Sequence, residues 1–317
     1  MKKPNRFNYL IEKIEKIEFK TKPFNFIYIE NFLSNKDLKE IISAKEINIT
    51  IDEKSDRKLI KSLEENNYVS QDFPGCTNNK EKYIYNRRKN NKVQSIYDGL
   101  GYVMRLMRTK TNVVTELNEF FSSPEFRDSL RKKFNLEGEL NIDTGIQKYL
   151  SNYAIAPHPD VRSKAATWML NINTHESAET AAIHTNLCSF KDEYKYIHTF
   201  WNKNLSIDRA WVPWNWCNTD FTSTKNNSII LFSPNDYSLH SVKLNYDHFL
   251  FQRTQFYGNL WYTNEKYKKL KYATFKYLDL VSKINIGIPD YTKKTNHEVV
   301  RKSSLLNPYK YLNYFKF

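Results

Sequence analysis

Cysteine is scarce in this chain, and its spacing excludes two kinds of protein. The 317 residues contain three cysteines, Cys76, Cys188 and Cys217, an odd number with wide separations. They provide neither a disulfide framework nor the CxxC pair of a zinc knuckle, so a reducing compartment is expected. No apolar run approaches the roughly 20 residues that span a bilayer, and the charged stretch after Met1 lacks the apolar core of a secretion signal. We therefore expect a cytoplasmic protein without a transmembrane segment.

A linker rich in glycine and serine is also missing, and so is an internal repeat. Apolar and aromatic side chains are abundant instead: hydrophobic residues make up 40% of the chain and aromatic residues 15%. This composition is typical of a folded protein and not of a disordered one. A chain of 317 residues is long enough to bury a large hydrophobic core.

Acidic residues are too few to balance the basic ones. The chain has 49 Lys and Arg against 35 Asp and Glu, a formal net charge of +14. Residues 266–317 hold 12 basic and 3 acidic residues, so +9 of this total lies in the last sixth of the chain. Such an excess favours anionic partners, nucleic acid among them. Because the charge gathers in the tail and does not flank the motif described below, nucleic acid is an alternative partner and not the favoured one.

The first half of the sequence predicts mainly helices. Apolar residues recur there at helical spacing, and Ser34 followed by Asp37 is a helix-start signal. A run of apolar residues after Pro23 predicts one strand, and the polar stretch around Pro74-Gly75 predicts loops. The expected elements are helices within 1–22, from 34 to about 42, and at 93–108, 113–121 and 124–134, a strand at 23–29, and a loop-rich segment at 52–91.

After Gly138 the sequence period changes to that of strands. Segments rich in β-branched and aromatic residues alternate with polar turns, which is typical of an antiparallel sandwich or barrel such as a jelly roll. The expected strands are 141–156, 165–173, 181–190, 210–216, 228–232, 238–244 and 249–262. We therefore predict a mainly β fold with a helical N-terminal half (α+β). It divides into an N-terminal strand and helices at 1–137, a β core at 138–263, and a basic C-terminal extension at 264–317 with a helical stretch at 270–281.

Two of the seven histidines occur in a pattern typical of a metal site. His158-Pro159-Asp160 leaves a predicted strand, and residues two apart on a strand point to the same face. His240, on another predicted strand, would add a third ligand. Two histidines and one carboxylate on one face of an octahedron leave three positions open, the arrangement of non-haem Fe(II) oxygenases. The remaining histidines, which lack partners at ligand spacing and are expected to be structural, are His175, His184, His198, His248 and His297.

Downstream of His240, the strand 249–262 carries one guanidinium among aromatic residues. On strand alternation Arg253 shares a face with Phe251 and Tyr257. A charge that faces inward is costly unless it is paired. A dicarboxylate co-substrate would pair Arg253 in a bidentate manner, which a planar guanidinium does well.

These segments resemble the 2-oxoglutarate and Fe(II)-dependent oxygenases, nearest to their prolyl-4-hydroxylase-like branch. The matching pieces together span residues 23–35 and 145–262, somewhat under half of the chain. In chain order they are the segment 23–34, the strand 149–153 leading to His158-x-Asp160, Lys164-x-x-Thr167, the segment 236–242 around His240, and Arg253.

The resemblance implies a double-stranded β-helix in which His158, Asp160 and His240 are the metal ligands and catalytic centre for Fe(II). In that family 2-oxoglutarate chelates the iron through its keto-acid end, and its far carboxylate meets a basic residue, here Arg253. Tyr149 stands where the family often has a residue that hydrogen-bonds the co-substrate. O2 is consumed, succinate and CO2 are released, and ascorbate is a candidate reductant.

The function expected from the resemblance is a dioxygenase that hydroxylates a C–H bond. Its substrate would be a small molecule, an amino acid or a peptide of the prolyl type. Two alternatives stay open at this point: an oxygenase that acts on nucleic acid, and a non-catalytic jelly-roll binding protein. Substrate-binding residues follow no spacing rule and are not assigned from the sequence.

Overall fold

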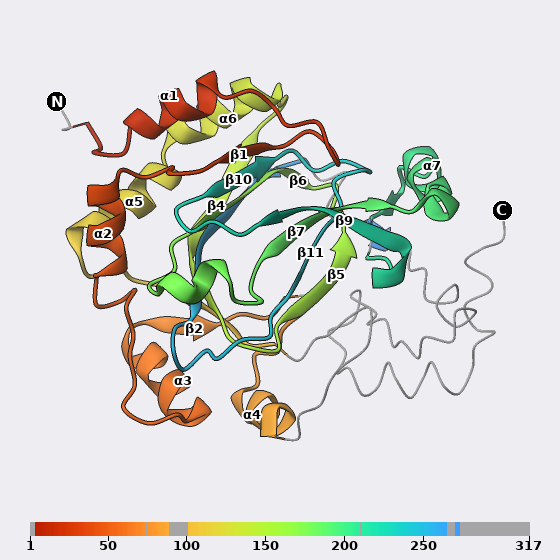
Figure 1. The fold of residues 1–317 in the computed structure, drawn as a ribbon. Helices are drawn as coiled ribbons and strands as arrows, with labels where there is room; N and C mark the ends of the chain where they lie inside the picture. Colours follow the sequence, from red (N-terminus) through yellow and green to blue (C-terminus); the bar gives the residue numbers. More distant parts are fainter. Residues whose placement is uncertain (1–3, 74, 89–100, 210, 265–269, 273–317) are drawn as a thin grey trace.

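Two antiparallel sheets form the centre of the molecule (Figure 1). The computed structural model describes residues 4–73, 75–88, 101–209, 211–264 and 270–272. The larger sheet has seven strands, in the order β1 (Ile27–Ile29), β10 (Ile229–Phe232), β6 (Lys164–Asn171), β12 (Arg253–Tyr262), β4 (Leu140–Tyr149), β3 (Val103–Leu106) and β2 (Tyr68–Ser70). The smaller sheet has four strands, in the order β5 (Ala154–His158), β11 (His240–Lys243), β7 (Thr185–Phe190) and β9 (Cys217–Ser223).

The chain passes back and forth between these sheets. Strand β4 lies in the larger sheet, β5 in the smaller, β6 in the larger, β7 and β9 in the smaller, β10 in the larger, β11 in the smaller and β12 in the larger. Apolar residues of both sheets meet in one cluster, in which Met169 and Phe232 of the larger sheet join Leu187 of the smaller. The two sheets therefore pack face to face, and the space between them receives side chains from strands far apart in the sequence.

The other face of the larger sheet is covered by helices. Trp168 of β6 points to that face and packs edge-on against Phe126, while Phe121 stacks on Phe256 of β12. Figure 1 shows these helices gathered along one side of the sheet. They are α1 (Tyr9–Lys16), α2 (Asn35–Ile42), α5 (Asn112–Phe121) and α6 (Pro124–Phe134).

Most of the predicted elements are present. Helices occur where expected at 113–121 and 124–134, and the hydroxyl of Ser34 accepts a hydrogen bond from the backbone N–H of Asp37 at the start of α2. The strands expected at 165–173, 228–232, 238–244 and 249–262 correspond to β6, β10, β11 and β12. The long strand expected at 141–156 is two strands, β4 and β5, which belong to different sheets. No helix among the described residues is long and apolar enough to cross a membrane.

The loop-rich prediction for 52–91 is wrong in large part. The segment contains α3 (Asp56–Glu65), β2 and α4 (Lys80–Arg88). Helix α3 forms because the Ser55 side chain caps it and because Leu59, Ile60 and Leu63 make one buried face. The helix predicted at 93–108 is also wrong where it can be compared: Val103–Leu106 is strand β3, and residues 89–100 lie outside the described part of the chain.

The strand predicted at 210–216 is wrong as well. Trp214–Trp216 is a short 3-10 turn that follows Pro213, and the strand begins only at Cys217 as β9. Helix α7 (Tyr196–Lys203) had no counterpart in the prediction. Strands β8 (Ile207–Asp208) and β13 (Lys271–Tyr272) pair in parallel, so the helix predicted at 270–281 begins as a strand. The rest of that helix and nearly all of the 264–317 extension, His297 included, lie outside the described residues.

Candidate metal centre

His158 and His240 lie on adjacent strands of the smaller sheet. Strands β5 and β11 are antiparallel, and their register places His240 directly opposite His158. Residues opposite each other on antiparallel strands have neighbouring side chains on one face. The two imidazole centroids are accordingly 4.3 Å apart. Strand pairing alone therefore brings together two residues that are far apart in the sequence.

Asp160 completes the group from just beyond the end of β5. It is only 5% exposed, and its Oδ1 lies 3.9 Å from Nε2 of His240. One potential ligand atom from each of His158, Asp160 and His240 lies within 4.8 Å of the others. Within the described residues, this is the group of three such side chains that could hold a metal ion.

Both imidazoles are oriented so that, among the described residues, Nδ1 has a hydrogen-bond partner and Nε2 has none. Nδ1 of His158 lies 2.8 Å from the carbonyl oxygen of Ala156, and Nδ1 of His240 lies 3.2 Å from that of Ser238. A carbonyl only accepts hydrogen bonds, so each Nδ1 carries the proton and each Nε2 presents its lone pair. This is the tautomer, and the outer hydrogen bond, that metal-ligating histidines use.

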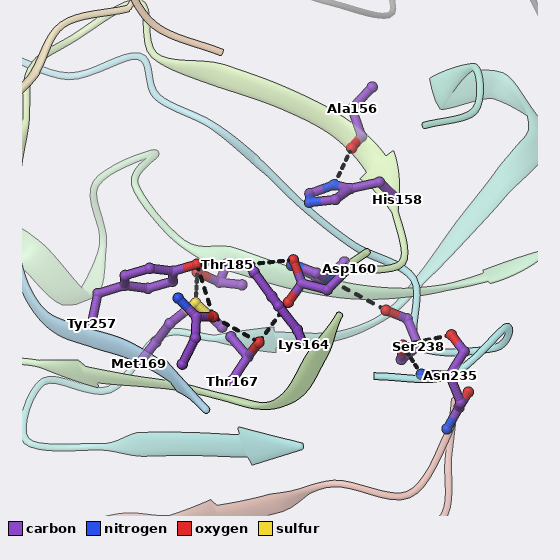
Figure 2. Close-up of polar contacts among 12 residues, drawn as sticks. Ala156, His158, Asp160, Lys164, Thr167, Met169, Thr185, Asn235, Ser238 and Tyr257 are labelled. Atoms are coloured by element: carbon purple, nitrogen blue, oxygen red, sulfur yellow. Dashed lines mark hydrogen bonds and ion pairs between the residues drawn. The ribbon is translucent and has the colours of Figure 1, made fainter. Parts of the chain in front are cut away.

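The Asp160 carboxylate is fixed by two side chains of the larger sheet (Figure 2). Nζ of Lys164 donates to Oδ1 at 2.7 Å, and Oγ1 of Thr167 donates to Oδ2 at 2.6 Å. Both donors lie on β6, whereas the carboxylate belongs to the segment that follows β5. The carboxylate orientation therefore depends on the packing of one sheet on the other.

Burial and neighbouring charges set the protonation states of the three side chains. Burial lowers the pKa of His158 to about 3, with a further decrease from His240. Burial also lowers the pKa of His240. For Asp160, burial alone would raise the pKa, but the Lys164 ammonium and the two imidazoles outweigh it and hold the pKa well below its usual range. At neutral pH the group is thus two neutral imidazoles and one carboxylate, the forms that bind a metal ion.

These donors fit a first-row divalent metal with open coordination positions. Two imidazole nitrogens and one carboxylate oxygen converge from a single side, which is the donor set of the two-histidine, one-carboxylate site of non-haem iron enzymes. Imidazole and carboxylate are ligands that Fe(II) accepts, whereas closed structural zinc sites are built mainly from thiolates.

Arg253 lies at the start of β12 and is 2% exposed. Its Nη2 donates to Oγ1 of Thr185 at 2.9 Å, and its guanidinium carbon lies 4.5 Å from the centre of the Tyr149 ring. Burial lowers its pKa, and the ionisable neighbours that act on that pKa are the hydroxyls of three tyrosines, Tyr149, Tyr153 and Tyr246. Among the described residues no carboxylate accounts for this buried cation.

Tyr149 pairs with Arg253 across strands β4 and β12. Its ring forms one face of the guanidinium site, and its hydroxyl is hydrogen-bonded to the side chain of Gln147. Burial raises the pKa of Tyr149, so the hydroxyl keeps its proton. Tyr149 therefore supports Arg253 through its ring; a contact with a co-substrate remains a prediction.

The register of β7 gives the spacing between the two parts of the site. Leu187 of β7 lies opposite His240, and Thr185, which contacts Arg253, lies two residues earlier on the same strand. Two residues of a strand correspond to roughly 7 Å. A five-carbon dicarboxylate has a comparable length.

The other described histidines do not join this group. His248 lies 2.8 Å from a carboxylate oxygen of Asp56, and His175 stacks on Phe251. His184 contacts the backbone carbonyl of Glu179, and His198 packs against Tyr237.

Three residues of the site were not assigned a role from the sequence. Lys164 and Thr167 hold Asp160, and Thr185 holds Arg253. Lys164 and Thr167 belong to the segment that carries the family resemblance. Lys164 is the first residue of a strand whose other residues are buried, and a lysine in that position indicates a paired charge. For Thr185 the sequence contains no such signal, because its partner lies 68 residues away on the other sheet.

Comparison with known proteins gives matches only at the level of structure. No family model matches the sequence, and no curated protein matches it. A prolyl-4-hydroxylase from Pseudomonas putida superposes with a TM-score of 0.39 and 8% identity, covering 81% of this chain and 100% of its own. A prolyl hydroxylase from Trichoplax adhaerens, in complex with a hypoxia-inducible-factor peptide fragment, superposes with a TM-score of 0.38 and 12% identity. The match covers 83% of this chain and 90% of that one.

A third similar structure is HygX from Streptomyces hygroscopicus, with nickel, 2-oxoglutarate and hygromycin B bound. Its TM-score is 0.36 and its identity 9%, and the match covers 78% of this chain and 91% of that one. Prolyl hydroxylases are among the structures similar to this chain. Because these scores and identities are low, the chemistry proposed below rests on the residues of this chain.

Proposed function

We propose that the chain is a 2-oxoglutarate and Fe(II)-dependent dioxygenase that hydroxylates a C–H bond of a small-molecule, amino-acid or peptidyl substrate. The observation that carries the proposal is the convergence of His158, Asp160 and His240 in their ligating forms. The order of the strands supports it, because the chain passes repeatedly between two facing sheets as in a jelly roll, with β7 and β9 the consecutive pair that stays in one sheet.

The three ligands would hold Fe(II), leaving positions for 2-oxoglutarate and O2. Bound iron and the co-substrate supply the oxidation of the C–H bond, with release of succinate and CO2. His158 and His240 contribute neutral nitrogen donors, because burial keeps both imidazoles unprotonated at neutral pH. Lys164 and Thr167 keep Asp160 aimed at the metal position.

Arg253 would bind the far carboxylate of 2-oxoglutarate. A buried guanidinium with a hydroxyl and an aromatic ring as neighbours leaves N–H donors for an incoming carboxylate. A bidentate pair of this kind is among the strongest hydrogen-bonded contacts in proteins. Arg253 therefore accounts for the choice of a dicarboxylate.

The experiment that tests the proposal measures succinate formed from 2-oxoglutarate in the presence of Fe(II) and O2, with wild type and Arg253→Gln. We expect Arg253→Gln to need at least ten times more 2-oxoglutarate for half-maximal turnover. The affinity of the protein for Fe(II) should change less than threefold, because Arg253 does not contact the ligand group.

Arg127→Gln is the control, since Arg127 lies on helix α6 and pairs with its neighbour Asp128. Its 2-oxoglutarate requirement should equal that of the wild type. No succinate from the wild type, with metal bound, would instead favour a non-catalytic binding protein. An unchanged 2-oxoglutarate requirement in Arg253→Gln would refute the role of Arg253.

A further inference from the structure

A pocket of about 290 Å³ lies next to the candidate metal centre. Arg162 and Lys164 line it, and they follow Asp160 by two and four residues. Residues 234–236 form another part of its wall, and they precede His240 by four to six residues. The two segments that supply the metal ligands therefore also build this pocket, and Lys164 contacts both the pocket and Asp160.

The pocket is lined by more positively charged side chains than negatively charged ones. Arg162, Lys164 and Arg209 line it, together with one carboxylate, that of Asp236. The ammonium of Lys164 is already paired with Asp160. A further carboxylate, Asp208, is 4% exposed; it accepts hydrogen bonds from the backbone N–H groups of Arg162 and Arg209, both at 2.8 Å.

Arg162 is fully used by the protein itself. Its Nε donates to the carbonyl of Ile207 at 2.9 Å, its Nη2 to the carbonyl of Trp201 at 2.6 Å, and its Nη1 to Asp236 at 3.4 Å. These bonds tie the segment after Asp160 to α7 and β8. Arg162 therefore holds the wall of the pocket and has little capacity for a ligand.

Arg209 has the unused capacity. It is 4% exposed, its Nε has no hydrogen-bond partner among the described residues, and its ion pair with Asp236 is long, at 3.6 Å. A buried donor without a partner costs free energy, and most such donors in proteins are satisfied. A guanidinium in this state is a binding group for a planar or tetrahedral oxyanion.

We propose that Arg209 binds an anionic group of the oxidised substrate, a carboxylate or a phosphate, in this pocket. The anion would complete the hydrogen bonds of Arg209 and would place the rest of the substrate toward the metal centre beside Lys164. Leu205 also lines the pocket and is 58% exposed, so an apolar surface is available for the carbon skeleton next to the anion. This inference rests on the proposed function and assigns it a substrate class, an anionic small molecule or the acidic end of a peptide.

The test uses metal-free protein, stripped on a chelating resin so that no soluble chelator supplies competing carboxylates. Inorganic phosphate and N-acetylglycine are titrated separately by calorimetry, and the probe that binds identifies the kind of anion. Saturable binding is expected for at least one probe. Arg209→Gln should weaken it at least tenfold, and Asp236→Asn should strengthen it severalfold, because it removes the carboxylate that competes for the guanidinium.

Arg127→Gln, a change at a partly exposed arginine that pairs with Asp128, is the matched control and should bind as the wild type does. Absence of saturable binding of both probes would overturn the proposal, and so would binding that Arg253→Gln abolishes and Arg209→Gln retains. If circular dichroism shows that Arg209→Gln does not fold, two other variants test the proposal. Arg209→Lys keeps the charge but lacks the planar bidentate donors, and should weaken anion binding, whereas Asp236→Asn should strengthen it. This binding test needs neither iron nor 2-oxoglutarate. Anion binding here, combined with no succinate in the separate turnover assay, would therefore refute the proposed function and leave the anion site standing.

Discussion

Two threonines on facing strands hold different parts of the candidate site. Thr167 on β6 donates to Asp160, and Thr185 on β7 accepts from Arg253. Both are nearly inaccessible, with exposures of 1% and 4%. At the scale of single residues, the metal part and the co-substrate part of the site therefore have separate supports.

Replacing Thr167 by the isosteric Val should weaken metal binding. Outer hydrogen bonds to metal ligands are worth about 10- to 100-fold in affinity, and Thr167→Val removes the one that orients Oδ2 of Asp160. Competition with a chromophoric chelator measures the change. Thr185→Val is the matched control: it should leave metal affinity unchanged and raise the 2-oxoglutarate requirement. Equal metal affinity in Thr167→Val and the wild type would show that Thr167 does not position the carboxylate.

Lys148 is a buried cation outside the site. Its Nζ donates to the carbonyl of Ile47 at 2.8 Å and to Oγ1 of Thr254 at 2.9 Å, and burial lowers its pKa to about 7. The unfolded chain keeps this proton up to about pH 10.4, so between pH 7 and that value the unfolded state binds more protons than the folded state. Stability should therefore rise with pH over this window.

Lys148→Met should remove this rise. The wild-type free energy of unfolding should increase from pH 7 to pH 9 with a slope of up to about 1.4 kcal/mol per pH unit from this group. Urea unfolding at a series of pH values measures the slope in both proteins. Lys164→Met is not a suitable control because it alters the site, so exposed Lys16→Met serves. The same slope in Lys148→Met and the wild type would contradict the prediction.

Strand β12 is the central element of the larger sheet, paired with β4 on one side and β6 on the other. Gly258 lies opposite Trp168 in this pairing, and a Cβ at position 258 would overlap the Trp168 ring and come within 2.6 Å of Oγ1 of Thr144. Gly145, across the strand pair from Tyr257, has more room: a Cβ there would be 3.5 Å from the nearest atom.

Gly258→Ala should therefore destabilise the protein by about 1–3 kcal/mol, the usual range for overpacking a core. Gly145→Ala, the matched control in the neighbouring strand, should cost clearly less. Thermal and urea unfolding of the two variants compare them directly. A Gly258→Ala protein as stable as Gly145→Ala would mean that Trp168 can move, and that the helix-covered face of the sheet is looser than its packing indicates.

Helices and strands whose apolar residues recur at one regular spacing could be predicted from the sequence. Elements that are buried on two faces could not, because they lack that spacing. The helices at 113–121 and 124–134 each present one apolar face, and both were expected. The sequence predicts a helix where strand β3 lies, because Val103, Met104 and Leu106 are all buried apolar residues and leave no strand alternation to read. Helix α3 was missed because its three apolar residues occur among seven polar ones, and only the Ser55 cap marks its start.

The site divides in the same way. His158 and Asp160 are two residues apart, so local spacing identifies them, and His240 follows from the strand on which it lies. Arg209 has no signal in the sequence, because its long ion pair with Asp236, which Arg162 also contacts, depends on how the folded chain places these side chains. Residues that act through long-range packing are thus the ones that spacing rules do not find.

At the scale of the whole molecule, the candidate site forms only when the two sheets pack. The ligands His158 and His240 belong to the smaller sheet, whereas Lys164, Thr167 and Arg253 belong to the larger. A ligand that binds the folded state alone stabilises it by RT ln(1 + [L]/Kd), so the free energy of unfolding rises with ligand concentration. Metal binding and folding are therefore expected to be coupled in this protein.

The most direct measurement is an anaerobic titration of the protein with Fe(II) in the presence of 2-oxoglutarate, followed by visible absorption. We expect one Fe(II) per chain and a weak charge-transfer band, absent in His158→Ala and Asp160→Ala and retained in His175→Ala, whose imidazole stacks on Phe251 outside the ligand group. A wild-type protein that binds no Fe(II), or a band that survives in Asp160→Ala, would contradict this expectation.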